Sequence, residues 1–230
     1  MMIKDELIRM IQRVAEALAD DLREKMAFVG GCTTALHLTD PVTLEGVRGT
    51  DDVDLVVEVA TLTGWYELLE RLQKSSFTLR PGEEVNCRLR LGELKVDFMP
   101  HNSSILGYTN RWYAEGFSNA DNYVLPNGLK IRVFSPPFYL GTKLEAFAGR
   151  GKGDLLRSKD MEDILSLIDG REELLFDVRA CPENLRQYII ESLQTLSASR
   201  DMDYAISAAA RGSVERADII WTRLEKLTHA

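Results

Sequence analysis

The stretch from Arg48 to Leu55 reads Arg-Gly-Thr-Asp-Asp-Val-Asp-Leu, and it decides the fold that we expect for the chain. Residues 52–59 have the apolar composition of a strand, in which successive side chains point to opposite faces. Asp52 and Asp54 therefore share one face. Neighbouring carboxylates repel each other unless a cation lies between them, and Mg²⁺ prefers such oxygen ligands. The pattern indicates either a magnesium site or an acidic strand end in solvent.

The residues before this strand predict a strand, a tight turn and a helix. Residues 26–29 are a short apolar run, Gly30 and Gly31 follow, and residues 32–38 have the composition of a helix start. Glycines let backbone N–H groups approach an anion closely, and a helix N-terminus adds partial positive charge. The pair indicates a phosphate-binding turn, although glycine pairs also occur in simple turns.

A third acidic residue lies on a predicted β-hairpin. Residues 85–91 and 94–99 alternate between apolar and polar side chains, and Gly92-Glu93 separates them. Asp97 lies on the face opposite to Leu94 and Val96 in the second of these strands. We expect Asp97 either to join the acidic pair or to be an ordinary solvent-facing residue.

The remaining pattern predicts two domains of different composition. Helices are expected over residues 4–25 and 64–74, and a strand pair over residues 123–133. Asp40-Pro41 and Gly46 are expected to break the chain before Arg48. Beyond Ser135 the helical pattern dominates, over residues 138–150, 158–168, 184–197, 202–210 and 213–227. We predict an α/β (α+β) domain with a mixed sheet and flanking helices in residues 1–135, followed by a helical bundle in residues 136–230.

Composition and charge exclude several classes of protein. The chain has 230 residues, of which 45% are hydrophobic and 28% are charged, as in ordinary globular proteins. A net charge of −8 argues against a large nonspecific nucleic-acid surface. The three cysteines form no CxxC pair, which favours a reducing compartment. Because no apolar run approaches the ~20 residues of a membrane span and no signal peptide is visible, we expect a soluble cytoplasmic protein without a membrane partner.

Three motifs occur in the order found in a known superfamily. They are Val-Gly-Gly at residues 29–31, Asp-Val-Asp-Leu at residues 52–55 and Val-Asp-Phe at residues 96–98. Together they resemble the nucleotidyltransferases of the DNA polymerase β-like superfamily. With Arg48 and Thr50 before the acidic pair, the chain looks most similar to abortive-infection toxin nucleotidyltransferases of the AbiEii type. The resemblance covers residues 26–168, and its fold would be the nucleotidyltransferase-type mixed sheet.

The resemblance implies a metal-dependent transfer of a nucleoside monophosphate from a nucleoside triphosphate such as ATP. Asp52 and Asp54 would hold Mg²⁺, or Mn²⁺, against the triphosphate. Asp97 would complete a second metal site or take the proton of the acceptor hydroxyl. Lys143, on a helix, would neutralise the leaving pyrophosphate.

The same resemblance assigns nucleotide-binding residues. Gly30, Gly31 and Thr33 would hold the phosphates through backbone N–H groups and a hydroxyl. Asp160 would contact the nucleotide or position Lys143, in a role for which Asp163 competes. Cys32 departs from the family, which often has a small hydroxyl residue there, so that any hydroxyl contact would fall to Thr33.

The acceptor is left open between several classes. The toxin-like resemblance implies transfer to tRNA or to a protein, with a neighbouring antitoxin as partner. An alternative is a small-molecule nucleotidyltransferase of the aminoglycoside-modifying kind, because an acidic protein of pI 5.1 suits cationic acceptors. A noncatalytic nucleotide-binding protein of the same fold is a further alternative, which the retention of all three acids disfavours.

Overall fold

The computed structural model describes residues 2–83, 85–150 and 153–230, which form a mixed α/β protein as the sequence predicts. The chain divides into two compact units, Met1–Thr33 with Gly49–Ser135 and Thr34–Arg48 with Pro136–Ala230. The chain changes unit after Ser135, where the sequence composition shifts to helix. Residues 34–48 belong to the second unit, although their position in the sequence suggested the first. Among the described residues, no helix has both the length and the apolar composition that a membrane crossing requires.

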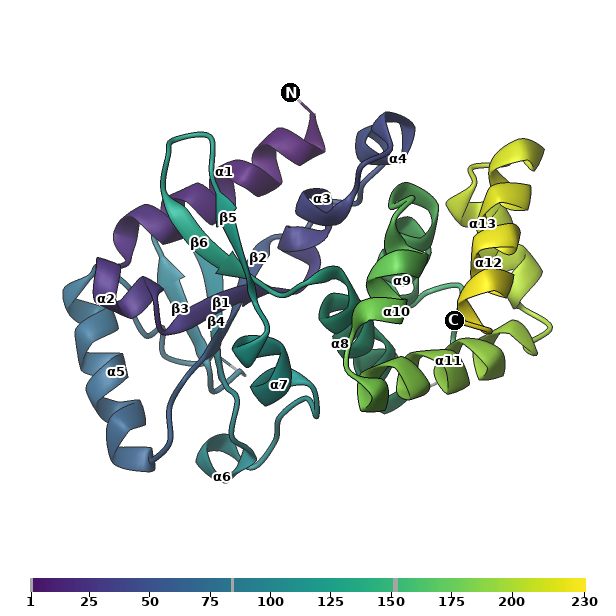
Figure 1. Ribbon diagram of the computed structural model, residues 1–230. Coiled ribbons are helices and arrows are strands. Elements are labelled where there is room, and N and C mark those ends of the chain that lie inside the picture. Colours follow the sequence, from purple (N-terminus) through teal and green to yellow (C-terminus); the bar gives the residue numbers. More distant parts are fainter. Residues whose placement is uncertain (1, 84, 151–152) are drawn as a thin grey trace. The chain divides into compact units, whose positions relative to one another are not determined.

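The first unit contains every strand of the sheet and several helices (Figure 1). Its strands are β1 (Met26–Val29), β2 (Asp52–Val57), β3 (Arg88–Leu91), β4 (Leu94–Pro100), β5 (Asp121–Val124) and β6 (Lys130–Val133). Its helices are α1 (Ile3–Ala17), α2 (Asp20–Arg23), α5 (Leu62–Lys74), α6 (Ser103–Leu106), α7 (Tyr113–Ser118) and the 3₁₀ helix η1 (Gly31–Thr33).

The six-stranded sheet has the order β3-β4-β2-β1-β6-β5 and is mixed. β2 runs parallel to β4 and antiparallel to β1, and β1 runs parallel to β6. The antiparallel pairs β3–β4 and β5–β6 form the two ends of the sheet. The strand that carries Asp52 and Asp54 therefore lies inside the sheet, between β1 and β4.

Alternating burial along β2 keeps its acids on one face. Val53 and Leu55 are fully buried, whereas Asp52 and Asp54 are only half-buried. A strand turns successive side chains to opposite faces, so the apolar residues anchor β2 in the core and leave the carboxylates together on the other side. The predicted facing of this strand is confirmed.

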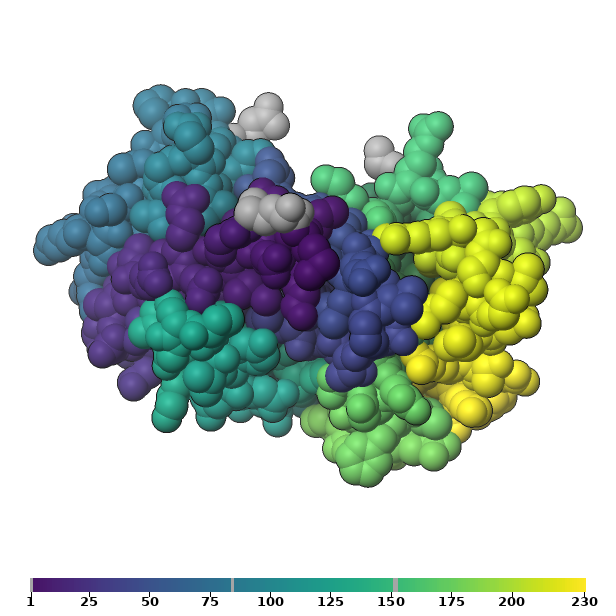
Figure 2. All heavy atoms as spheres, turned by 90° about the horizontal axis from the view of Figure 1, so that it is seen from above, coloured from purple at the N-terminus to yellow at the C-terminus, as the bar shows by residue number. Residues whose placement is uncertain are grey.

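The N-terminal segment is two helices rather than the single helix predicted for residues 4–25. α1 ends at Ala17, and Leu18 is extended. Nη1 of Arg23 donates hydrogen bonds to the carbonyl oxygens of Ala15, at 2.9 Å, and Leu18, at 3.1 Å. Because Arg23 satisfies carbonyl groups at the end of α1, the helix stops there without a glycine or proline. The outward side of α1 is exposed on the first unit (purple in Figure 2).

Two local signals in the first unit set the limits of its elements. The hydroxyl of Thr61 accepts a hydrogen bond from the backbone N–H of Gly64 at 3.1 Å, so Thr61 is the N-cap of α5. Gly92 has a φ of +63° in the turn between β3 and β4, a conformation that favours glycine. The predicted hairpin is confirmed, although its first strand begins at Arg88 rather than at residue 85.

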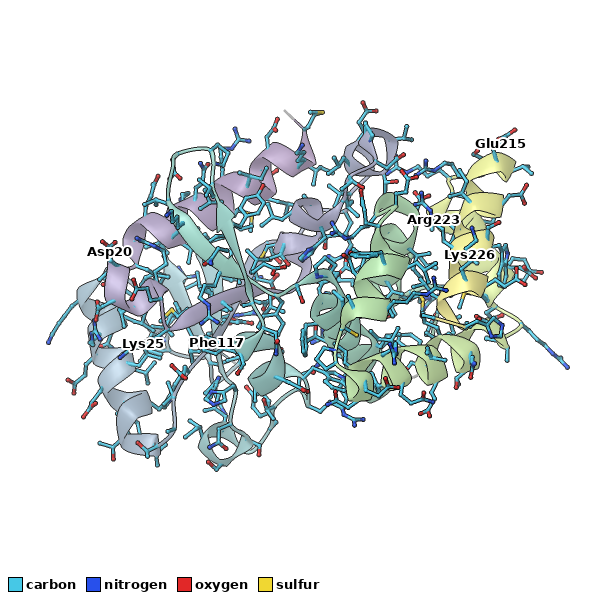
Figure 3. The ribbon with its side chains drawn as sticks, viewed as in Figure 1. Asp20, Lys25, Phe117, Glu215, Arg223 and Lys226 are labelled. Atoms are coloured by element: carbon cyan, nitrogen blue, oxygen red, sulfur yellow. The ribbon has the colours of Figure 1, made fainter. Side chains whose placement is uncertain are left out.

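The second unit is helical. Its helices are α3 (Thr34–His37), α4 (Pro41–Glu45), α8 (Pro136–Arg150), α9 (Lys159–Gly170), α10 (Leu174–Ala180), α11 (Glu183–Ser197), α12 (Met202–Ala209) and α13 (Val214–Leu227). α8 packs against α9, α10 and α11, and α9 also packs against α12 and α13. Arg223 of α13 points toward α9 in Figure 3, and its Nη1 donates to the carbonyl oxygens of Ile168 and Asp169 at the end of that helix.

Asp40-Pro41 begins a helix instead of breaking the chain, contrary to the sequence-based expectation. A side-chain oxygen of Asp40 accepts a hydrogen bond from the backbone N–H of Thr43 at 2.9 Å, which makes Asp40 the N-cap of α4. Pro41 takes the first helical position, where the missing N–H costs nothing. Neither α4 nor α10 was predicted from the sequence.

Candidate functional site

Three acidic side chains converge at the centre of the sheet in the first unit. β2 supplies Asp52 and Asp54, and β4 supplies Asp97. Asp54 and Asp97 are direct neighbours in the parallel pairing of these strands. One carboxylate oxygen of each residue lies within 4.8 Å of those of the other two. Two oxygens bound to one Mg²⁺ are at most about 4.2 Å apart, so the cluster is close to the size of a metal coordination shell.

Gly30 makes room for one of these carboxylates. It follows β1, in which Val29 pairs with Asp54, and its φ is +78°. A Cβ atom at Gly30 would lie 1.9 Å from Oδ2 of Asp54, well inside van der Waals contact. The carboxylate of Asp54 therefore lies against bare backbone at this turn. The sequence had assigned Gly30 to phosphate binding, and the structure adds its close approach to an acid of the cluster.

The rest of the glycine turn is tightly hydrogen-bonded. Gly31 and Thr33 belong to η1 and are buried. The hydroxyl of Thr33 donates to the carbonyl oxygen of Gly30 at 2.9 Å, and the backbone N–H of Thr33 donates to the same oxygen at 3.1 Å. The hydroxyl proton of Thr33 is thus used within the turn. A contact of Gly31 or Thr33 with phosphate stays a prediction.

Arg88 is a further member of the site that the sequence analysis missed. It lies directly opposite Asp97 in the β3–β4 pair. Its Nε and Nη2 atoms donate to Oδ1 and Oδ2 of Asp97, each at 2.7 Å, and Nη2 lies 3.5 Å from Oδ2 of Asp52. The hydrogen bond to Asp97 is the main cause that raises the pKa of Arg88 above its usual value. The hairpin register would have revealed this arginine, because a turn at Gly92-Glu93 places it across from Asp97.

Other side chains define the surroundings of the cluster. The hydroxyl of Thr50 donates to Oδ1 of Asp52 at the start of β2. Burial, with the nearby charge of Asp97, raises the pKa of the Cys87 thiol to about 11. The hydroxyl of Tyr108 donates to this sulfur at 3.6 Å. Cys87 is therefore a neutral thiol at physiological pH, whereas metal ligation requires a thiolate.

The acidic cluster has the donor set of a divalent metal site. Its three acids outnumber Arg88, the cation that binds Asp97 and approaches Asp52. Carboxylate oxygens are the ligands that hard divalent cations prefer, and a tight group of like charges is stabilised when such a cation binds. The residues therefore fit a divalent cation, and Asp52, Asp54 and Asp97 could hold it.

Lys143 and Asp160 lie together in the second unit, in a network of buried charges. Nζ of Lys143 is 3.3 Å from Oδ1 of Asp160 and 2.6 Å from Oδ2 of Asp163. Arg48 makes two hydrogen bonds of 2.7 Å to the carboxylate of Asp163. Arg150 binds both oxygens of Asp160, at 2.9 and 3.0 Å. The predicted proximity of Asp160 to Lys143 is present, and contact of either residue with a nucleotide stays a prediction.

The environment keeps Asp160 ionised. Burial would raise the pKa of this carboxyl, but hydrogen bonds and charges from Arg150 and Lys143 outweigh it and hold the pKa below its usual range. Asp163 is the more enclosed acid, because it is fully buried and shared by Arg48 and Lys143. Both acids contact Lys143, and the preference of the sequence analysis for Asp160 stays a prediction.

Comparison with known proteins adds no family to these observations. The sequence matches no protein-family model, and no curated protein is similar to it.

Proposed function

We propose that the protein is a nucleotidyltransferase, which uses Mg²⁺ to move a nucleoside monophosphate from a nucleoside triphosphate to an acceptor. The observation that carries this proposal is the convergence of Asp52, Asp54 and Asp97 within 4.8 Å, beside a glycine turn. The sequence order of turn, acidic pair and third acid supports it independently. Mn²⁺ would serve in place of Mg²⁺, because both ions take oxygen ligands.

In this proposal each acid has a separate task. Asp52 and Asp54 hold the metal through their shared face of β2. The bound ion would orient the triphosphate and neutralise the charge that develops on it. The acceptor oxygen bonds to the α-phosphorus, the bond from that phosphorus to the bridging oxygen breaks, and pyrophosphate leaves. Asp97 takes the proton of the acceptor hydroxyl or adds a further oxygen ligand.

The glycine turn has a matching task. The triphosphate would lie beside the cluster, where Gly30 brings backbone close to Asp54. A backbone N–H at Gly31 would then donate to a phosphate oxygen, as glycine turns do in other phosphate sites. Thr33 supports the turn through its bonds to the carbonyl of Gly30.

The acceptor is proposed to be tRNA or a protein, in keeping with a toxin whose activity an antitoxin partner would restrain. A small-molecule acceptor is the second candidate, and the net charge of −8 favours it if the acceptor is cationic. A binding protein without activity is the third candidate. The intact acidic cluster favours the enzyme over the binding protein.

The test is transfer of label from each α-³²P nucleoside triphosphate in the presence of Mg²⁺ and total tRNA, followed by gels for RNA and protein. Wild-type protein is compared with Asp52→Ala and with the matched control Asp51→Ala. Asp51 is the preceding acid, is exposed, and pairs with Lys95 outside the cluster. We expect label in RNA or protein that Asp52→Ala abolishes and Asp51→Ala retains. Full activity of folded Asp52→Ala would overturn the proposal.

If neither gel shows label, a second assay separates the two remaining candidates. Cationic small molecules, including aminoglycosides, are then supplied as acceptors and the products separated by thin-layer chromatography. A labelled small molecule would establish the second candidate. If no acceptor is labelled although calorimetry detects triphosphate binding, the binding protein is the better description.

A further inference from the structure

The guanidinium of Arg88 contacts carboxylate oxygens that a metal in this cluster would need as ligands. It takes both carboxylate oxygens of Asp97 at 2.7 Å and approaches Oδ2 of Asp52 to 3.5 Å. The side chain of Arg88 is only 15% exposed, so solvent screens these contacts weakly. One cationic group of the protein thus bridges two of the three acids.

This bridging differs from the usual support of a metal ligand. A residue that merely orients a carboxylate contacts that one ligand from behind, whereas Arg88 contacts carboxylates from both β2 and β4. We propose that Arg88 is an internal counter-cation, which competes with a divalent metal for Asp97 and Asp52. The inference rests on the proposed function only because it requires the acidic cluster to bind a metal.

Glu83 gives the displaced arginine a second partner. Nη1 of Arg88 lies 3.7 Å from Oε1 of Glu83, on the side away from its contacts with Asp97. The other oxygen of Glu83 accepts from Arg90, at 3.0 Å, so this carboxylate is already held in place. When a metal takes the oxygens of Asp97, Arg88 keeps a carboxylate within reach. The exchange therefore leaves no partly buried guanidinium without an acid beside it.

The consequence is a metal site whose affinity is lowered by its own arginine. Binding of the ion must break charge-assisted hydrogen bonds between Arg88 and Asp97. A hydrogen bond to a charged group contributes enough that its loss changes an equilibrium by about tenfold or more. Removal of the guanidinium should therefore tighten metal binding by about tenfold.

Weaker metal binding after removal of Arg88 would instead identify it as a residue that positions Asp97. If Arg88 served to orient Asp97 for the metal, its removal would weaken binding, as loss of outer partners of metal ligands typically does by about 10- to 100-fold. The direction of the change in metal affinity thus separates the two roles. Enzymatic activity is not needed for this measurement.

The experiment is a titration with Mn²⁺ alone at fixed ionic strength, in which electron paramagnetic resonance measures the free ion. Wild-type protein is compared with Arg88→Gln, with Asp54→Asn as the variant that lacks a ligand, and with Arg90→Gln as the matched control. Arg90 lies two residues along the same strand, is similarly enclosed, and binds Glu83. Its removal takes away the same charge and one partner of Glu83, but it leaves the contact of Arg88 with Glu83 and the bridge between Asp97 and Asp52.

We expect Arg88→Gln to bind Mn²⁺ about tenfold more tightly than wild type, and Arg90→Gln to stay within about twofold of wild type. Equal or weaker binding by Arg88→Gln, with binding lost in Asp54→Asn, would overturn the competition and leave the metal site intact. Equal tightening by both arginine variants would also overturn it, because a general field effect would explain the result. Failure of wild type and of every variant, Arg88→Gln included, to bind Mn²⁺ would overturn the competition and the proposed metal site together.

A second variant guards against loss of folding. If circular dichroism shows that Arg88→Gln is unfolded, Arg88→Lys replaces it, because a lysine cannot donate to both oxygens of Asp97 in the fork geometry of a guanidinium. We then expect binding that is tighter than in wild type by a smaller factor. Unchanged or weaker binding by folded Arg88→Lys would contradict the competition.

Discussion

Each of the two units contains a cluster of charged side chains, and the clusters differ in their balance of charge. In the first unit Arg88 contacts two of the three clustered carboxylates, those of Asp97 and Asp52. In the second unit Asp163 is bound by Arg48 and Lys143, so its charge is fully matched inside the protein. Asp163 is completely buried, whereas 29% of the Asp52 side chain is exposed. Loss of one partner from a matched, enclosed cluster destabilises a fold, whereas a surplus of carboxylates in a more open position favours binding of a cation.

The largest effect is expected from a variant that breaks the matched cluster of the second unit. Asp163→Ala removes the carboxylate shared by Arg48 and Lys143, and should lower the free energy of unfolding by about 3–5 kcal/mol, as loss of one partner of a buried ion pair does. Asp52→Ala should change it by less than about 1 kcal/mol, because that residue is partly solvated. Urea denaturation measures the change in the free energy of unfolding in each variant. Equal losses in the two variants would show that the clusters do not differ in this way.

The second largest effect is expected at Gly30, in the turn beside the acidic cluster of the first unit. Gly30→Ala forces a residue with a Cβ into a φ of +78° and places that atom 1.9 Å from Oδ2 of Asp54. We expect a loss of roughly 3 kcal/mol in the free energy of unfolding from backbone strain and overlap together. Mn²⁺ binding should weaken in the same variant because Asp54 must move. Gly128→Ala is the control, since its φ is +84° but nothing lies within 4 Å of the added Cβ.

A buried histidine makes the second unit sensitive to acid. Burial, with the charge of Arg171, lowers the pKa of His37 from 6.5 to about 3, so the folded protein keeps this ring neutral in mild acid. The unfolded chain takes up the proton below about pH 6.5, and the free energy of unfolding therefore falls as the pH drops from 6.5 toward 3. Between pH 7 and pH 5 the loss should be about 2 kcal/mol.

The matched variant for this histidine is His37→Phe. It keeps an aromatic ring against Tyr139, whose centroid lies 4.6 Å from that of His37, and it removes the titrating group. The fall in the free energy of unfolding from pH 7 to pH 5 should then be smaller than in wild type by about 2 kcal/mol. Denaturation curves at the two pH values measure it. An undiminished pH dependence in the variant would assign the acid sensitivity to other residues.

The smallest expected effect is stabilisation by the metal itself. A divalent ion at ten times its dissociation constant should raise the free energy of unfolding by about 1.4 kcal/mol, because it binds only the folded cluster. Asp52→Ala should lose this response. A variant of the matched cluster that still folds, Asp160→Asn, should keep it. Thermal unfolding with and without Mg²⁺ measures the difference, and loss of the response in both variants would contradict the assignment of the site to the first unit.

Local patterns predicted most of the elements that surround the site. The strand predicted for residues 52–59, with both acids on one face, is present over Asp52–Val57, and burial of Val53 and Leu55 confirms its facing. The turn at Gly92-Glu93 predicted the hairpin that carries Asp97. Such signals succeed because side-chain alternation and positive φ are properties of a few adjacent residues.

The errors occurred where distant side chains decide the outcome. The single helix predicted for residues 4–25 is divided because Arg23 folds back to the carbonyl groups of Ala15 and Leu18. Arg88 was missed although the predicted hairpin places it opposite Asp97, and its approach to Asp52 depends on the pairing of β2 with β4. The segment of residues 34–48 joined the second unit, whose α9 packs against α3 and α4.

The sequence by itself determined the residue types of the candidate site, the facing of Asp52 and Asp54, and the glycine turn that precedes them. The tertiary structure alone decided that Asp97 joins them and that Arg88 bridges Asp97 to Asp52. Parallel pairing of β2 with β4 connects strands that lie far apart in the chain, so no local pattern fixes their register. Charge balance in a cluster depends on that register, because a carboxylate is neutralised only by the cation that the fold brings within a few ångströms.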